Sequence, residues 1–146
     1  MSVLLDTNIL TRSAQPAHSM HKDALDAVGL LRIRGEELCI VPQNLIEFWA
    51  VATRPLSANG LQMATVQAKA ELARIKSLFR FLADTPTIYD EWEKLVAQHA
   101  VSGKNSYDAR IVAAMNVHGL KQLLTFNAAD FKRYQGITVV SPAAVR

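Results

Sequence analysis

A single cysteine, Cys39, occurs among the 146 residues, so the chain cannot form an internal disulfide or a cysteine-based metal site. Its apolar neighbours, Leu38 and Ile40, predict a small residue of the core. No run approaches the ~20 consecutive apolar residues that a membrane span needs. The N-terminus also has no basic segment followed by an apolar stretch and a cleavage site. We therefore expect a cytoplasmic protein with no membrane association.

Neither sign of charge dominates the composition. Sixteen Lys and Arg against thirteen Asp and Glu leave a formal charge of +3, which is compatible with a polyanionic partner but is weak evidence for one. Half of the residues are hydrophobic and a fifth are charged, which argues against disorder. There is no internal repeat, and the length is that of a common single domain, so residues 1–146 are expected to form one domain.

Short apolar runs alternate with segments of helical period along the chain. The runs predict strands over residues 3–5, 38–41, 122–125 and 137–140, and their lack of polar alternation is typical of parallel strands covered on both faces. Helices are predicted over residues 17–34, 43–53, 62–82, 89–100 and 106–118. Strands that alternate with helices in this way predict a layered α/β fold with a parallel sheet.

Polar side chains follow the first and third of these strands. In "SVLLDTNIL" Asp6 comes directly after the first strand, where Thr7 and Asn8 could shape the turn or orient the carboxylate. Thr125, Asn127 and Asp130 follow the third strand. Capping is the simpler interpretation of each taken singly, with Asp6 as a helix N-cap and Asn127 and Asp130 as a capping box. Ligands of open parallel sheets, however, bind beyond the carboxyl ends of the strands.

Two further acids lie on predicted helices. Glu47 is one turn into the helix after the second strand, on a face with small or uncharged neighbours that suits the wall of a cleft. Asp108 shares a helix face with the apolar residues Ile111, Val112 and Met115, and capping by Asn105 or Ser106 does not explain why it faces inward. An inward carboxylate needs a hydrogen bond, a cation or a metal ion.

Taken together, these residues bring oxygen ligands to one edge of the predicted sheet. Carboxylates and a carboxamide without a cluster of His or Cys suit Mg²⁺ or Mn²⁺ rather than Zn²⁺. Such ions keep several waters and leave room for phosphate oxygens, and they activate water for phosphodiester hydrolysis. The pattern therefore favours a metal-dependent hydrolase of phosphodiester bonds.

At these residues the sequence resembles the PIN-domain family, in particular the VapC-type toxins of bacterial toxin–antitoxin pairs. The similar segments, in family order, are "LLDTNIL", "NLIEFWAVATRP", "SYDARIVAAMNVHG" and "LLTFNAADFKRYQGITVVSP". The resemblance implies a three-layer α/β/α sandwich around a mostly parallel sheet. It also implies an endoribonuclease that uses Mg²⁺ or Mn²⁺, forms a homodimer and is blocked by a small antitoxin, through which alone it would contact DNA.

The resemblance also implies roles for individual residues. Asp6, Glu47 and Asp108 match the three acids of the family's metal centre, and Asn8 and Thr125 match supporting polar positions. The family often has a fourth acid where this chain has Asn127, so Asp130 becomes a candidate substitute or outer ligand, and the number of metal ions is left open. Contacts with the RNA backbone are assigned to three basic residues near the motifs, namely Arg12, Lys104 and Arg110.

The residues leave two other functions to consider. A phosphatase with an aspartate nucleophile would need a second Asp where Asn8 stands. A catalytically silent module that binds RNA or a protein partner is favoured if Asn127 prevents productive metal binding. Trp49 and Trp92 could stack on bases, but both lie on apolar helix faces and are expected to pack in the core. No catalytic role is assigned to any of the four histidines.

Overall fold

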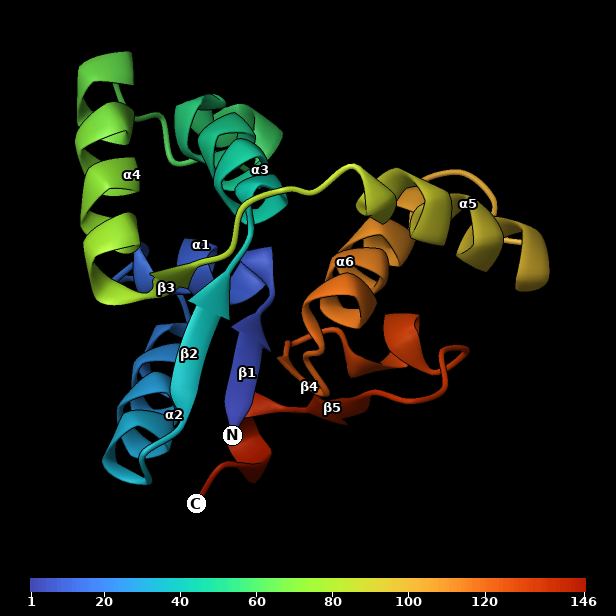
Figure 1. The fold of residues 1–146 in the computed structure, drawn as a ribbon. Coiled ribbons are helices and arrows are strands. Elements are labelled where there is room, and N and C mark those ends of the chain that lie inside the picture. Colours follow the sequence, from blue (N-terminus) through green and yellow to red (C-terminus); the bar gives the residue numbers. More distant parts are fainter.

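The computed structural model describes all residues 1–146 and contains one five-stranded, fully parallel sheet (Figure 1). The spatial order is β3-β2-β1-β4-β5, so the first strand lies at the centre. The bounds are Ser2–Leu5 for β1, Glu37–Ile40 for β2, Arg80–Phe81 for β3, Gln122–Leu124 for β4 and Thr138–Val140 for β5. Four of the five strands thus lie where the apolar runs predict them.

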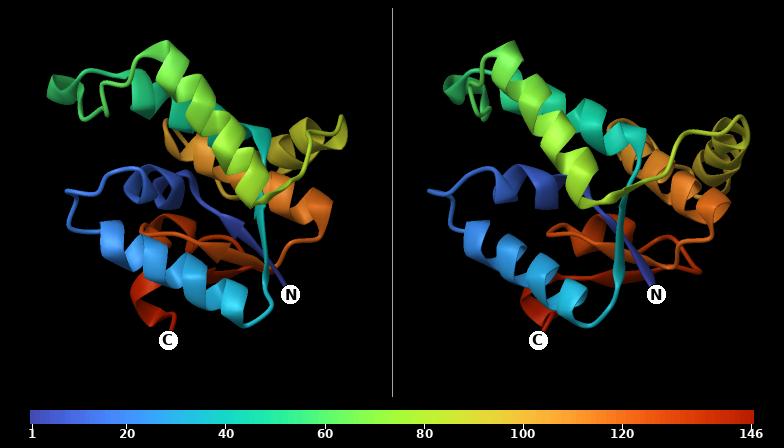
Figure 2. Two further views of the ribbon diagram at one scale, coloured as in Figure 1. Left: turned by 90° about the vertical axis from the view of Figure 1, so that its left-hand side faces the viewer. Right: turned by 60° about the vertical axis from the view of Figure 1, so that its left-hand side comes forward.

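Six helices cover the sheet. They are α1 (Thr7–Ser13), α2 (His21–Ile33), α3 (Pro42–Thr53), α4 (Thr65–Leu78), α5 (Thr87–Gln98) and α6 (Asn105–His118), with short 3-10 turns at Leu56–Ala58, Ala128–Phe131 and Pro142–Ala144. Figure 2 shows α2 and α4 in front of the sheet when the left-hand side of Figure 1 faces the viewer. No helix combines the length and the apolar character needed to cross a bilayer.

Alternate residues of the central strand point into two separate cores. Val3 and Leu5 pack against α1 to α4, in a cluster that includes Phe48 and Ile75. Leu4 points to the other face and packs against α5 and α6. This is the alternation expected of a strand that is buried on both sides. The predicted three-layer α/β/α arrangement is therefore confirmed.

Two predictions at element boundaries are wrong. The helix predicted over residues 62–82 ends at Leu78, and Arg80–Phe81 form the edge strand β3 beside β2. A two-residue strand has no periodicity of its own, so the preceding helical pattern masks it. The helix predicted over residues 17–34 begins only at His21. In addition, the segment after Asp6 forms a helix, α1, which the apolar pattern of residues 2–10 does not reveal.

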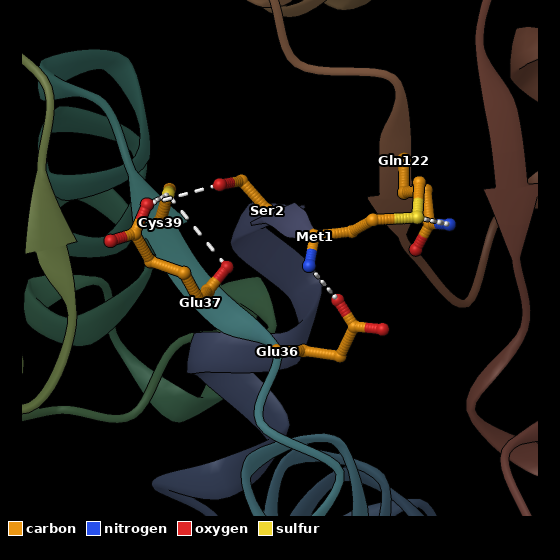
Figure 3. Close-up of polar contacts among 6 residues, drawn as sticks. All are labelled: Met1, Ser2, Glu36, Glu37, Cys39 and Gln122. Atoms are coloured by element: carbon orange, nitrogen blue, oxygen red, sulfur yellow. Dashed lines mark hydrogen bonds and ion pairs between the residues drawn. The ribbon is translucent and has the colours of Figure 1, made fainter.

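Acidic side chains at the amino ends of the strands each have a cationic partner. The α-amino group of Met1 lies 3.1 Å from Glu36 Oε2, and Arg80 Nη1 lies 2.7 Å from Glu37 Oε1. Ser2 Oγ also donates to Glu37 Oε1 at 3.0 Å (Figure 3). This edge of the sheet is therefore electrically compensated and needs no ligand.

Cys39 lies on β2 near this edge and is fully buried, which confirms its predicted place in the core. Burial, reinforced by the nearby Glu37 carboxylate, raises the pKa of the Cys39 thiol to about 11. The thiol therefore stays protonated at neutral pH and is neither a nucleophile nor a metal ligand there.

Candidate active site

Asp6 begins the polar cluster at the carboxyl edge of the sheet. It leaves β1 and becomes the N-cap of α1, where its Oδ1 accepts a hydrogen bond from Thr7 N at 2.8 Å. The N-cap interpretation of Asp6 is thus correct, yet only one of its oxygens is used in this way. The side chain is 7% exposed, so its second oxygen also needs a partner.

That second oxygen is bound from β4. Thr125, directly after β4, donates from Oγ1 to Asp6 Oδ2 at 2.7 Å. The same hydroxyl accepts from Asn8 Nδ2 at 3.1 Å, and Asn8 Oδ1 accepts from Phe126 N at 3.2 Å. Asn8 and Thr125, the predicted supporting residues, therefore lie beside Asp6 and fix the orientation of its carboxylate. Their hydrogen bonds connect the carboxyl ends of the neighbouring strands β1 and β4.

Glu47 approaches the same place from α3. Its Oε1 accepts from Thr7 Oγ1 at 2.6 Å and its Oε2 from Gln43 Nε2 at 3.0 Å. Gln43 Nε2 also donates to the backbone oxygen of Tyr107 at 2.8 Å, which fixes the first turn of α6 and hence the neighbouring Asp108. One buried amide thus connects two of the helices that carry the predicted acids.

Gln43 and Asn44 are among the uncharged residues that the sequence places on the helix face of Glu47, but the sequence alone assigns them no role. Asn44 is fully buried, where it accepts from Val41 N at 2.9 Å and donates to Thr7 Oγ1 at 3.3 Å. A signal was present, because Gln43 stands four residues before Glu47 and such pairs face each other on a helix. Adjacent amides right after an apolar strand are also expensive to bury without partners.

Asp108 is half-buried and no protein group donates a hydrogen bond to its carboxylate. Burial, and then the carboxylates of Asp6, Asp130 and Glu47, raise its pKa to about 7. The prediction that Asn105 or Ser106 caps this helix is wrong, because the cap position is Lys104 and no side chain caps it. Capping therefore gives no structural reason for an acid here.

The pKa of Asp6 is also shifted by burial and by nearby acids. Burial raises the pKa of its carboxyl group, the hydrogen bonds from Thr125 and Thr7 lower it, and the charges of Glu47 and Asp130 raise it again. The charges of Glu47 and Asp130 thus reach both Asp6 and Asp108 across the carboxyl edge, and none of these four acids forms an ion pair. In contrast to the acids at the opposite edge, these four have no ion-pair partner, although the charge of Arg133 is close enough to lower the pKa of Asp108.

The segment after β4 differs from its predicted capping box. Residues Ala128–Phe131 form a single 3-10 turn, and the Asn127 side chain caps nothing, so that prediction is wrong. Instead Asn127 N donates to Thr125 Oγ1 at 3.0 Å. The exposed Asp130 is close enough to raise the pKa of both Asp6 and Asp108, whereas the Asn127 side chain is exposed and bears no charge.

The three basic candidates lie in different settings. Arg110 already donates to Gln43 Oε1 and to Asp84 Oδ2, at 3.2 Å in each case. Lys104 is exposed at the start of α6, and Arg12 lies on α1 beyond Asn8. Both tryptophans are partly buried against the cores, as predicted, and Trp92 donates from Nε1 to the backbone oxygen of Ser106 at 2.8 Å.

The structure brings together no group of three or more His, Cys, Asp or Glu side chains that could hold a metal ion, so Asp6, Glu47 and Asp108 do not form a ready-made three-carboxylate site. Mg²⁺ keeps several waters and can bind through only one or two carboxylates. The donors are all oxygens, and Asp108 has no ion-pair partner, so a bound cation would stabilise its charged form. Oxygen donors of this kind are the ligands that Mg²⁺ and Mn²⁺ prefer.

The sequence profile of the PIN domain matches residues 3–137, which include every residue of this cluster. The chain belongs to the PIN domain family. No curated protein sequence was found to match it. All four acids of the cluster, which follow β1, lie on α3 and α6, and follow β4, are therefore inside the part of the chain that matches the PIN domain.

Solved structures with the same fold come from toxin–antitoxin assemblies. A chain of VapBC2 from Rickettsia felis, bound to a promoter DNA fragment, is 17% identical with a TM-score of 0.70, over 97% of this chain and 98% of that one. A chain of VapBC-1 from nontypeable Haemophilus influenzae is 16% identical with a TM-score of 0.71, over 98% and 99%. VapC20 of Mycobacterium tuberculosis, a toxin that cleaves the sarcin-ricin loop, is 16% identical with a TM-score of 0.62, over 83% and 86%.

Proposed function

We propose that this PIN domain is an endoribonuclease dependent on Mg²⁺ or Mn²⁺, in which Asp6, Glu47 and Asp108 bind the ion. The observation that carries the proposal is the group of carboxylates without ion-pair partners at the carboxyl edge, within which Asp108 has a pKa of about 7. When bound, the ion would activate water and neutralise charge on the scissile phosphate. Thr7, Thr125 and Gln43 orient the carboxylates before substrate arrives.

The remaining polar residues have supporting roles in this proposal. Asn8 keeps Thr125 directed at Asp6, and Asp130 adds negative charge at the outer side of the cluster. Lys104 and Arg12 bind phosphates of the RNA backbone, since neither forms an ion pair within the protein. Arg110 is occupied by Gln43 and Asp84, so it contributes more to the position of Gln43 than to RNA affinity.

The experiment that tests this function is RNA cleavage with the metal varied. Purified protein should cleave structured RNA in Mg²⁺ or Mn²⁺ and lose that activity in EDTA, because the proposed mechanism depends on the ion to activate water. Activity should return when the ion is added back in excess of the chelator. Cleavage that persists unchanged in EDTA would contradict the metal role of the carboxylates.

We further propose that the chain is the toxin of a toxin–antitoxin pair and acts in the cytoplasm, where its RNA substrate lies. The support is the shared fold with VapBC assemblies from two organisms and with VapC20. A basic side chain of an antitoxin could pair with the acids of the carboxyl edge and so block the site, because arginine binds carboxylates in a bidentate fashion. Any contact with DNA would then be made by the antitoxin.

A homodimer is the third part of the proposal. Ile46, Tyr107 and Tyr89 are 68%, 63% and 59% exposed. Ile46 and Tyr107 line one hollow beside Glu47, and Tyr107 and Tyr89 line the next. Exposed apolar side chains that gather in this way are typical of a protein interface, and here we assign them to a second copy.

Replacing Ile46 with Lys is expected to shift the protein from twice the chain mass to the chain mass, because a charge would be buried without a partner. Size-exclusion chromatography with light scattering measures this change. Val66→Lys on α4 is the matched control, since Val66 is 82% exposed and lies outside both hollows. A dimer that tolerates Lys at position 46 would exclude this patch as the interface.

The alternative is a catalytically silent module that binds RNA or a protein. It is favoured because no group of three or more His, Cys, Asp or Glu side chains could hold a metal ion, and because Asn127 stands at a position that is often acidic in the family. Calorimetric titration with Mn²⁺ separates the two functions. The nuclease should show a saturable site whose affinity for Mn²⁺ falls in Asp108→Asn, whereas a silent module should bind RNA without such a site.

A further inference from the structure

The largest cleft of the molecule, about 610 Å³, opens directly beside the proposed metal centre. One end is lined by Thr7, Asn8 and Glu47, which belong to the cluster described above. From there the cleft runs along α1 and α3 to the loop that follows α3. Only two of its twelve lining residues are hydrophobic, and its volume is in the range of pockets that hold small ligands such as a nucleotide.

The charge of the cleft reverses with distance from the acids. Glu47 is the only acid in its lining, whereas Arg12, Arg54 and His18 line the part beyond it. Neither arginine takes part in an ion pair, although Glu47 lines the same cleft. Negative charge for a cation and positive charge for an anion thus stand side by side in one continuous space.

Arg12 is placed to accept an anion. Its Nη1 donates to Gln15 Oε1 at 2.7 Å, which ties the guanidinium to its own helix. Its Nε is buried and has no hydrogen-bond partner. A buried donor without a partner carries a desolvation penalty that an incoming acceptor removes, and a guanidinium matches phosphate oxygens well.

Arg54 stands at the other side of the cleft on a loop of defined shape. Gln62 N donates to the backbone oxygen of Arg54 at 2.8 Å, and Gly60 N donates to Pro55 O at 2.9 Å. A Cβ at Gly60 would lie 2.1 Å from the backbone oxygen of Arg54, so only glycine lets the loop return this closely. The backbone that carries Arg54 is therefore fixed, while its side chain remains exposed.

We propose that this cleft binds the nucleotide next to the scissile bond, with Arg12 and Arg54 on the phosphate that adjoins the one being cleaved. The inference rests on the proposed ribonuclease function. RNA carries a phosphate at every nucleotide, so a strand whose scissile phosphate lies at the acids must place the next phosphate close to the same negative charge. Two unpaired arginines at that point offset the repulsion and fix the direction in which the strand leaves the site.

Binding and cleavage are measured separately in the test. A fluorescently labelled RNA oligonucleotide is titrated by anisotropy with the full chain in EDTA, in an Asp108→Asn background, so that both the metal and one proposed ligand are removed and cleavage is suppressed. Arg12→Ala and Arg54→Ala should each weaken binding about 10-fold and lower the slope of log affinity against log salt by about 0.7, the value for one lost contact on a single strand. In the wild-type background with Mg²⁺, the same substitutions should act mainly by raising KM.

Matched variants keep the result interpretable. Arg34→Ala, at an exposed position after α2 and outside the cleft, should leave both the affinity and the salt slope unchanged. Arg12→Lys should retain the salt slope but only part of the affinity, since it keeps the charge and loses the planar fork. Arg12→Gln replaces Arg12→Ala if the alanine variant has a lower melting temperature.

The outcomes separate the two hypotheses. RNA affinity that falls in both arginine variants supports the subsite, even if no divalent ion supports cleavage and the ribonuclease proposal fails. Cleavage in Mg²⁺ with affinity, salt slope and KM unaffected by both arginine substitutions would overturn the subsite alone. The subsite proposal would also be overturned if both arginine substitutions abolished binding of an acidic peptide while RNA affinity stayed the same. The cleft would then be a binding site for a protein segment.

Discussion

Asp6→Asn and Asp108→Asn should each reduce the rate of RNA cleavage by about 10²–10³-fold at saturating Mg²⁺. Removal of one preorganised charge from an active site commonly has an effect of this size, which corresponds to about 3–4 kcal/mol in the activation free energy. The substitutions keep the shape of the side chain, so the fold is expected to persist. Cleavage rates are measured by gel on a labelled RNA, with melting temperatures recorded for each variant.

The matched control is Glu37→Gln at the opposite edge of the sheet. Glu37 is also an acid at the end of a strand, but Arg80 and Ser2 already satisfy its carboxylate. Loss of an exposed ion pair changes stability by about 1 kcal/mol or less, and RNA cleavage should stay at the wild-type level. If Asp108→Asn cleaved RNA as fast as Glu37→Gln, the carboxylates at the carboxyl edge would have no catalytic role.

The parallel sheet could be predicted because its central strands are buried on both faces. An apolar run such as Val3–Leu5 is rare outside a core, and the predicted strands at 38–41, 122–125 and 137–140 all pair with a neighbour in the structure. The edge strand Arg80–Phe81 could not be found in this way. Both of its residues are exposed, and its pairing depends on tertiary contact with β2 rather than on a local pattern.

The residues of the polar cluster also differ in whether a local sequence pattern reveals them. Asp6 and Asp108 can be predicted because a carboxylate directly after a buried strand, or on the apolar face of a helix, is unusual and needs a partner. The partners that orient the acids were harder to find, since Gln43 and Asn44 look like ordinary first-turn residues of a helix. Their hydrogen bonds run to Tyr107 and Thr7, which are distant in sequence, so only the folded chain reveals them.

Without divalent ions, the protein should become less stable as the pH rises from about 4 to above 7. The pKa of Asp108 is about 7 in the folded chain, against about 3.9 expected when unfolded, so the folded state binds more protons in this interval. The stabilising contribution is present below pH 4 and lost as the pH passes 7. Since Asp108 is only half-buried, solvent screening reduces the expected loss to about 1–2 kcal/mol.

The effect is measured as the difference between wild type and Asp108→Asn in thermal melts with EDTA. The variant cannot ionise at this position, so it should melt roughly 3–6 °C higher at pH 8 and close to wild type at pH 4. Other titrating groups cancel in this difference. If the difference between the two proteins did not depend on pH, repulsion among the acids could not be its cause.

Addition of Mg²⁺ or Mn²⁺ connects this stability effect to the proposed chemistry. A cation that binds the ionised cluster should raise the melting temperature of wild type at pH 8 and much less at pH 5, because it competes with the proton for Asp108. In Asp108→Asn the rise at pH 8 should be smaller, since one charged ligand is missing. An equal rise in both proteins at both pH values would place the bound ion elsewhere, and the carboxylates would then need a different explanation from metal binding.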